Sequence, residues 1–187
     1  MSNNKLDAEV SIEGGVKIFK RSTAVNLYRV QFDTEITNSY NYAELINLLK
    51  NASKNDVFEF VLQNFGGSCH SCVGLVNVMK ECEANILCEV IGPCYSAGST
   101  IALAGTGIRA HPDSLLMFHN FSTIQVGKAN EIEISLDASK KWIHSYMKRN
   151  HMPFLTEKEC DNLIKGQDLY VYTSDKDFKK RCVRHFK

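Results

Sequence analysis

The sequence lacks any apolar run that approaches the roughly 20 residues a helix needs to cross a bilayer. Its polar start, MSNNKLDAEV, also lacks the apolar core of a secretory signal peptide. We therefore expect no membrane partner, and we expect the protein to stay in the compartment where it is made, the cytoplasm.

An excess of charge of one sign is also lacking. The net charge is +1 and the isoelectric point is about 7.6, so the chain as a whole carries no electrostatic footprint for nucleic acid. The one basic run, Lys179 to Arg181 followed by Arg184, is typical of a solvated helix face. No nucleic-acid partner is expected.

An even set of cysteines is missing as well. Seven cysteines without a secretion signal indicate reduced thiols rather than a disulfide framework. The segment Cys69-His70-Ser71-Cys72 has the spacing of a zinc or redox pair, but no second Cys/His pair follows at the distance typical of zinc fingers. We predict no metal and no cofactor, and interpret the pair as small residues lining a buried helix face; metal binding by Cys69 and Cys72 stays open as the alternative.

The 187 residues, 44% of them hydrophobic, are enough to bury one substantial core. Residues 1–24 are polar, contain Gly14-Gly15 and are expected to form an N-terminal arm whose structure the sequence determines poorly. Residues 25–187 are expected to form a single domain. The sequence contains no internal repeat and no low-complexity linker.

Strand, turn and helix patterns alternate along the domain. Strands are predicted over residues 26–32, 57–62, 86–91, 115–118 and 169–173, with a short apolar segment at 108–110. Helices are predicted from residue 38 or 39 to 49, over 73–79, after Ser96, over 128–150, from the capping box at 156–159 to 166, and from about 174. This order favours an α/β fold in which parallel strands carry helices on the sheet.

The segment from Ile86 to Ala104 organises this pattern. An apolar run is broken by Gly92-Pro93 and resumes as a helix, which puts Ser96 at the turn between strand and helix. The partial positive charge of a helix N-terminus would stabilise an oxyanion formed beside Ser96. The alternative is that Ser96 only caps the helix.

Three polar residues follow apolar strands or turns in a similar way: Ser96, His119 and Asp168. A serine hydroxyl becomes a nucleophile when an imidazole accepts its proton and a carboxylate orients that imidazole. We predict a catalytic triad of these residues. The alternatives are a hydrogen-bonded histidine at a strand end and a solvated turn aspartate. The order Ser, His, Asp is not that of an α/β-hydrolase.

A diglycine, Gly66-Gly67, ends the strand at 57–62 and lets the backbone approach a ligand closely. We predict that the backbone N–H groups of Gly67 and Ala97 form an oxyanion hole. An ordinary tight turn is the alternative.

Together these segments resemble the proteolytic subunit of the Clp protease, a self-compartmentalising serine peptidase with the ClpP/crotonase fold. The segments that carry the resemblance are residues 64–68 (NFGGS), 95–99 (YSAGS), 117–120 (MFHN) and 127–134 (GKANEIEI), and it extends from about Asn26 to Asp177. It implies stacked strand-turn-helix units with a protruding handle helix near residues 128–150.

The resemblance also implies a serine endopeptidase that cleaves unfolded polypeptides or short peptides inside a homo-oligomeric ring. That ring would be heptameric, possibly stacked in pairs, and could receive substrate from an ATP-driven Clp-type unfoldase. The chain departs from the family pattern at Phe65 (proline in the family), Ala97 (methionine) and Gln167, where an arginine usually helps to join two rings.

Three other functions stay open at this point. The chain could be a catalytically silent ring subunit that regulates an active paralogue, a viral capsid-maturation protease, or a crotonase-type enzyme acting on coenzyme A thioesters. A crotonase-type enzyme would use a carboxylate base rather than a serine.

Overall fold

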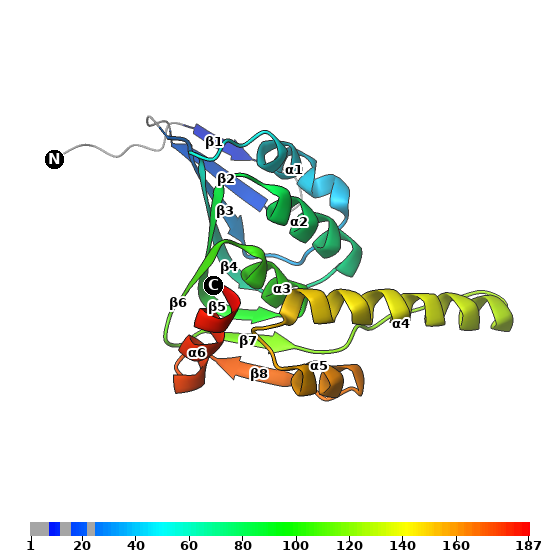
Figure 1. Ribbon diagram of the computed structural model, residues 1–187. Helices are drawn as coiled ribbons and strands as arrows, with labels where there is room; N and C mark the ends of the chain where they lie inside the picture. Colours follow the sequence, from blue (N-terminus) through cyan, green and yellow to red (C-terminus); the bar gives the residue numbers. More distant parts are fainter. Residues whose placement is uncertain (1–7, 12–15, 22–24) are drawn as a thin grey trace.

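The computed structural model describes residues 8–11, 16–21 and 25–187, which form one twisted sheet with helices packed against it (Figure 1). The strands are β1 (Ala8–Ser11), β2 (Val16–Arg21), β3 (Leu27–Phe32), β4 (Val57–Asn64), β5 (Asn85–Tyr95), β6 (Gly107–Ala110), β7 (Leu115–Phe118) and β8 (Leu169–Tyr172). The helices are a 3₁₀ turn, η1 (Ser39–Tyr42), and α1 (Ala43–Lys50), α2 (Cys69–Glu81), α3 (Ala97–Ala104), α4 (Ala129–His151), α5 (Glu157–Ile164) and α6 (Lys176–His185).

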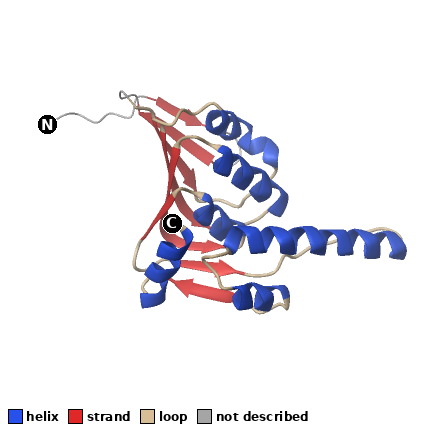
Figure 2. Cartoon of the chain, in the orientation of Figure 1, coloured by secondary structure: helices blue, strands red, loops and turns tan. Residues whose placement is uncertain are grey.

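The centre of the sheet is parallel, as the alternating pattern predicts. The strand order is β1-β2-β3-β4-β5-β7-β8. Strand β6 pairs with the first half of β5, and β7 pairs with the last residues of β5. Strands β3 to β7 pair in parallel, and Figure 2 shows α1, α2 and α3 on one face of this sheet. The expected α/β architecture is confirmed.

Two strands extend the sheet inside the segment expected to be an arm. Strands β1 and β2 pair antiparallel with each other, and β2 pairs antiparallel with β3. The sequence pattern did not predict them, because residues 1–24 are largely polar and Gly14-Gly15 lies between the two segments. The rest of the expected arm, residues 1–7, 12–15 and 22–24 with Gly14-Gly15, lies outside the described residues.

Strand β5 does not end at Gly92-Pro93, and the predicted boundary at residue 91 is wrong. The strand continues to Tyr95 and pairs there with β7, Pro93 opposite Leu115. On the β4 side the ladder shifts register between Leu62 and Asn64, opposite this stretch. A proline has no N–H to donate, so its position at an irregularity of the ladder leaves no bond broken. The extra length carries Ser96 beyond the end of β4.

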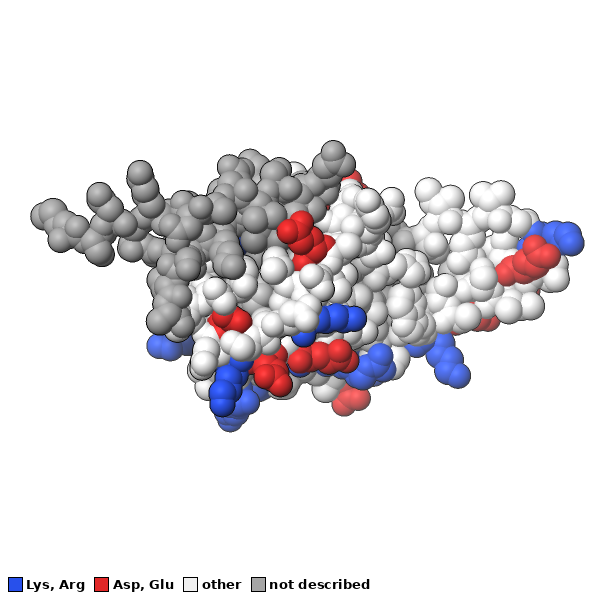
Figure 3. All heavy atoms as spheres, turned by 90° about the horizontal axis from the view of Figure 1, so that it is seen from above, with Lys and Arg blue, Asp and Glu red and all other residues white. Residues whose placement is uncertain are grey.

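Helix α4 is the protruding helix predicted over residues 128–150 (Figure 1). Its carboxyl-terminal half packs on the domain through Ile143, Tyr146 and Met147, which are buried. Its amino-terminal half extends from the body, as the space-filling view also shows (Figure 3), and leaves the Ile134 side chain 70% exposed. No helix in the described part of the chain is long and apolar enough to cross a membrane.

The carboxyl-terminal elements hold β8 against β7. Thr156 and Glu159 form the predicted capping box at the start of α5. Arg181 of α6 donates two hydrogen bonds to the Glu159 carboxylate, at 2.7 and 2.9 Å, and Phe178 of α6 packs against Phe154. Helix α5 precedes β8 in the sequence and α6 follows it, so contacts between the two helices hold both ends of the segment that contains β8.

Candidate active site

Ser96 occupies a strained turn between β5 and α3. Its φ is 55° and its ψ is −120°, and within the described residues no other residue except glycine has a positive φ. Such a conformation costs about 1–3 kcal/mol and persists where the surrounding structure enforces it. Ser96 is the N-cap residue of α3, but its side chain makes no capping hydrogen bond, so the hydroxyl is not used to cap the helix.

Backbone and side-chain hydrogen bonds hold this turn on both sides. The Ser96 N–H donates to the Met117 carbonyl of β7 at 2.8 Å, and the Thr100 N–H donates to the Ser96 carbonyl at 3.1 Å. Below the turn, the buried Ser99 hydroxyl lies 2.6 Å from the Cys94 carbonyl oxygen and accepts the Met117 N–H at 3.1 Å. Hydrogen bonds from the ends of both β5 and β7 therefore hold Ser96 in its strained conformation.

The diglycine after β4 lies against the Ser96 turn. Gly66 has a φ of 93°, and a Cβ added there would lie 2.9 Å from the Ser96 Cβ. Gly67 has a φ of 140°, and a Cβ there would collide with the Ile36 backbone. The buried Asn64 side chain accepts the Gly66 N–H at 2.7 Å and donates to the Thr34 carbonyl, which fixes the turn.

The pairing of this segment determines where its N–H groups point. Ile36 donates to the Gly66 carbonyl at 2.8 Å and accepts from the Ser68 N–H at 2.7 Å. The Gly67 N–H is therefore turned away from Ile36. The Ala97 N–H belongs to the first turn of α3, whose N–H groups have no partner within the helix.

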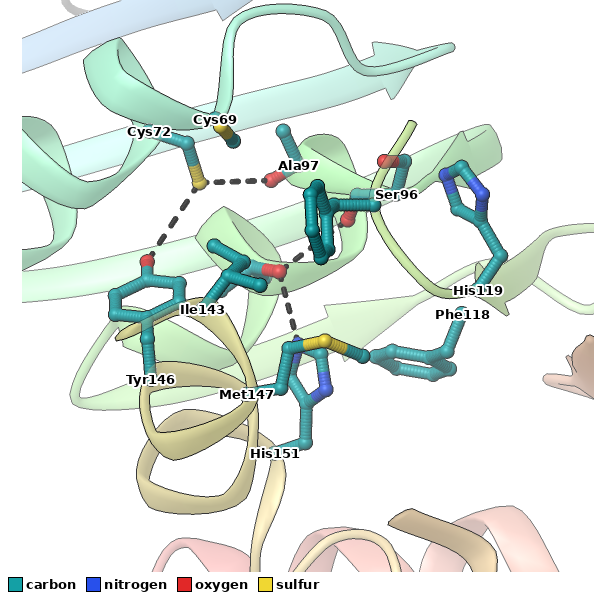
Figure 4. A pocket seen from close by; sticks show the side chains of 12 residues that line it. Cys69, Cys72, Ser96, Ala97, Phe118, His119, Ile143, Tyr146, Met147 and His151 are labelled. Atoms are coloured by element: carbon teal, nitrogen blue, oxygen red, sulfur yellow. Dashed lines mark hydrogen bonds between the residues drawn. The ribbon is translucent and has the colours of Figure 1, made fainter. Parts of the chain in front are cut away.

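Ser96 and His119 line the same two cavities. One is small, about 50 Å³, mostly apolar and bounded by α3 and the carboxyl-terminal half of α4 (Figure 4). The other is about 390 Å³, more polar, and includes Gly67 and Trp142 in its wall. Figure 4 shows the Ser96 side chain and the His119 ring next to each other at one end of the small cavity. The structure thus brings two of the three predicted triad residues together.

The pairing of β7 with β8 determines where the backbone of Asp168 lies relative to that of His119. Phe118 pairs with Leu169 in this antiparallel ladder, so His119 and Asp168 occupy the next pair of positions. Asp168 is exposed and lines a separate small cavity with Glu159 and Asn162. Among the described residues, no hydrogen bond joins the side chains of Ser96, His119 and Asp168.

A buried histidine that the sequence analysis missed supports the Ser96 turn. His151, the last residue of α4, lies with its Nε2 3.0 Å from the Thr100 hydroxyl, and that hydroxyl donates to the Ser96 carbonyl at 3.3 Å. Burial lowers the pKa of His151 to about 3, so its ring is neutral. The one sequence signal for this role is the position of His151 at the end of a long helix, two residues before Pro153.

Cys69 and Cys72 lie at the start of α2, beside both cavities. Cys69 is half-buried and Cys72 is buried in the wall of the small cavity. Within the part of the chain that the structure describes, no group of three or more His, Cys, Asp or Glu side chains could hold a metal ion.

Comparison with known proteins identifies a family to which most of the chain is similar. A family model described as Clp protease matches residues 16–157, about three quarters of the chain. The matched range includes Gly67, Ser96 and His119 and ends before Asp168. No curated protein matches the chain significantly.

Proposed function

The chain belongs to the Clp protease family, and on that premise we propose that it is a serine endopeptidase whose nucleophile is Ser96. One observation carries this proposal: a strained serine and a histidine lie at the ends of adjacent parallel strands and line the same cavities. In such a strained turn the serine hydroxyl does not bond to an N–H group of the helix and is free to meet an incoming carbonyl group.

In the proposed reaction, the Ser96 oxygen attacks the carbonyl carbon of a peptide bond while His119 accepts the hydroxyl proton. His119 then donates that proton to the leaving amine. Asp168, which like His119 lies one residue beyond the last pair of the β7–β8 ladder, holds the imidazole in the required tautomer and stabilises its charged form. Triad hydrogen bonds are often long in a resting enzyme and shorten when substrate binds, so their absence among the described residues is compatible with this role.

The negative charge that develops on the substrate oxygen is stabilised by backbone N–H groups. Gly67 faces away from Ile36 and lines the larger cavity with Ser96, and Ala97 is the first residue of α3. Their N–H groups are the proposed donors. Each donor of this type lowers the barrier by about 3–4 kcal/mol. The family's proline and methionine are replaced here by Phe65 and Ala97, which changes side chains and keeps both donors.

We also propose that the protein works as a homo-oligomeric ring with a Clp-type unfoldase. The amino-terminal half of α4 and the preceding loop expose Ile124, Val126 and Ile134, which a monomer would leave in water. A heptameric ring that encloses the site would protect folded proteins from cleavage. Gln167 stands where the family usually has an arginine that helps to join two rings.

A second candidate is a catalytically silent ring subunit. The observation that favours it is the exposed position of Asp168 in a cavity that includes neither His119 nor Ser96. In such a subunit the histidine would lack its orienting carboxylate, and the domain would serve assembly alone.

Hydrolysis of a short fluorogenic peptide by the isolated full chain tests the proposal and separates the two candidates. We expect wild type and Ser174→Ala, which changes an exposed serine remote from the cavities, to cleave at equal rates. Ser96→Ala should lose activity by about a millionfold. Equal cleavage by Ser96→Ala would overturn the assignment of the nucleophile, and a fully assembled but inactive wild type would favour the silent subunit.

A further inference from the structure

The first turn of α2 carries two thiols that the proposed chemistry does not use. Cys69 follows the N-cap residue Ser68, whose hydroxyl accepts the Ser71 N–H at 3.3 Å, and Cys72 lies one turn further on. Both thiols lie in the wall of the small cavity that Ser96 and His119 share, and Cys69 lines the larger cavity too. Figure 4 shows both side chains near Ala97, the residue that follows the proposed nucleophile.

The spacing of the two cysteines suits a bond between them. Residues three apart in an α-helix have Cα atoms about 5 Å apart, and disulfides join Cα atoms about 4.4–6.8 Å apart. In a regular helix the Cβ atoms of such a pair are about 5–6 Å apart, whereas a disulfide needs about 3.8 Å. Closing the bond therefore requires the first turn of α2 to tighten.

The two thiols differ in environment, which assigns their order of reaction. The Cys69 sulfur is half-exposed and lies 3.7 Å from the His70 Nδ1. Burial raises the pKa of the Cys72 thiol to about 12, so Cys72 stays protonated. An oxidant from solvent meets Cys69 first.

The sulfur of Cys72 is tied to the proposed oxyanion turn. Its S–H donates to the Ala97 carbonyl oxygen at 3.5 Å, and the sulfur lies 3.7 Å from the Tyr146 hydroxyl of α4 (Figure 4). Ala97 is also the residue whose N–H is the second proposed oxyanion donor. Bond formation with Cys69 takes away the S–H that Cys72 donates to the Ala97 carbonyl and moves the sulfur relative to Tyr146.

We propose that Cys69 and Cys72 form a redox-active dithiol that a hydroperoxide converts to an intrahelical disulfide. The Cys69 sulfur attacks the peroxide, the O–O bond breaks, and one oxygen leaves as water, or as the alcohol of an organic peroxide. The resulting sulfenic acid is attacked by the Cys72 sulfur, which releases its proton and expels a second water. Two thiols lose two protons and two electrons, and the peroxide gains them.

The disulfide reduces the reactivity of Ser96; this part rests on the proposed function. The tightened turn removes the hydrogen bond to the Ala97 carbonyl and the contact with Tyr146, which together position the start of α3. A displacement of about 1 Å in such a site costs on the order of a hundredfold in rate. We expect a fall of at least about tenfold, reversed by a dithiol reductant.

The experiment treats the intact protein with hydrogen peroxide and makes two independent measurements. Mass spectrometry of unreduced peptides looks for a Cys69–Cys72 link, and a fluorophosphonate probe measures the labelling rate of Ser96 before oxidation, after it and after dithiothreitol. Cys69→Ser and Cys72→Ser should form no link and keep their labelling rate under peroxide. Cys182→Ser, a change at a half-buried cysteine of α6, should behave as wild type.

Each outcome decides the proposal. A link at these two residues together with reversible slowing supports it. Free Cys69 and Cys72 after oxidation, or a link that leaves labelling unchanged, overturns it. If reduced wild type is not labelled at all, the proposed function fails, and the peptide measurement alone still decides whether the dithiol exists. The reversal by dithiothreitol is measured on wild type, so the test holds even if a cysteine variant fails to fold.

Discussion

His119 and Asp168 stand opposite each other at the first positions beyond the paired residues of β7 and β8. The pair Phe118 and Leu169 ends the ladder, so the backbone brings an imidazole and a carboxylate to the same edge of the sheet. Ser96 reaches that edge from the neighbouring strand, because its N–H bonds to the Met117 carbonyl. A carboxylate in this place can orient His119 if its exposed side chain turns inward when substrate binds.

Removing the charge of Asp168 tests this relationship. Asp168→Asn should lower kcat for peptide cleavage by about 10⁴-fold, because an amide favours the wrong tautomer of the imidazole. The free energy of unfolding should change by less than about 0.5 kcal/mol, since the residue is exposed. Asp175→Asn, a change at a nearby exposed aspartate whose side chain makes no capping bond, is the matched control and should cleave normally. Equal rates for both variants would exclude Asp168 from the reaction.

The diglycine turn is tested by one methyl group. Gly67→Ala should lower kcat by about 10²- to 10³-fold, because its Cβ would collide with the Ile36 backbone and move the proposed donor. Gly74→Ala within α2 is the control, since nothing lies within 4 Å of the added Cβ. It should leave kcat unchanged and stabilise the fold by about 0.5–1 kcal/mol. Full activity of Gly67→Ala would show that its N–H is not a donor.

Assembly depends on the exposed apolar residues of the α4 region. Wild type should sediment well above the 21.1 kDa of one chain. Ile134→Glu places a charge where a 70% exposed isoleucine now lies and should shift the protein to smaller species. Glu133→Gln, a neutral change at the adjacent residue, should assemble as wild type. A monomeric wild type, or an Ile134→Glu variant of unchanged size, would contradict this role of α4.

The ion pair between α5 and α6 makes stability depend on pH. Hydrogen bonds from Arg181 lower the pKa of Glu159 to about 2, against an ordinary value of 4.5. The folded state therefore holds the charged form more strongly than the unfolded state, and the stabilisation is full above pH 4.5 and is lost as pH falls toward 2. Glu159→Gln should cost about 1–2 kcal/mol at neutral pH and little at low pH, measured by urea unfolding.

The neighbouring Glu157 supplies the control for this measurement. Glu157 is an exposed residue of the same helix turn and forms no ion pair with any described residue. Glu157→Gln should follow the wild-type curve of stability against pH. If Glu159→Gln also follows it, the ion pair does not carry the acid dependence.

Much of this fold could be predicted because its signals are local. The alternation of residues 26–32, the capping box at Thr156 and the long amphipathic pattern up to His151 each specify one element. The parallel sheet follows from their order. The four segments that resemble the Clp protease family lie at or beside the ends of strands and helices, and their order along the chain carries the resemblance.

The errors arise where distant residues decide local structure. Gly92-Pro93 would end an isolated strand, but here pairing with β7 and an irregular ladder on the β4 side carry the strand through. The strands β1 and β2 depend on the edge offered by β3. The support of the Ser96 turn by Thr100 and His151 joins residues 51 positions apart, which no local pattern reveals.

The most direct test of the central claim is to map where a fluorophosphonate reacts on the intact wild-type protein. We expect one phosphonylated residue, Ser96. The adduct should be lost in His119→Ala, because the serine then lacks its base. An unlabelled Ser96 in correctly assembled protein, or an adduct on another residue, would contradict the claim that Ser96 is a nucleophile.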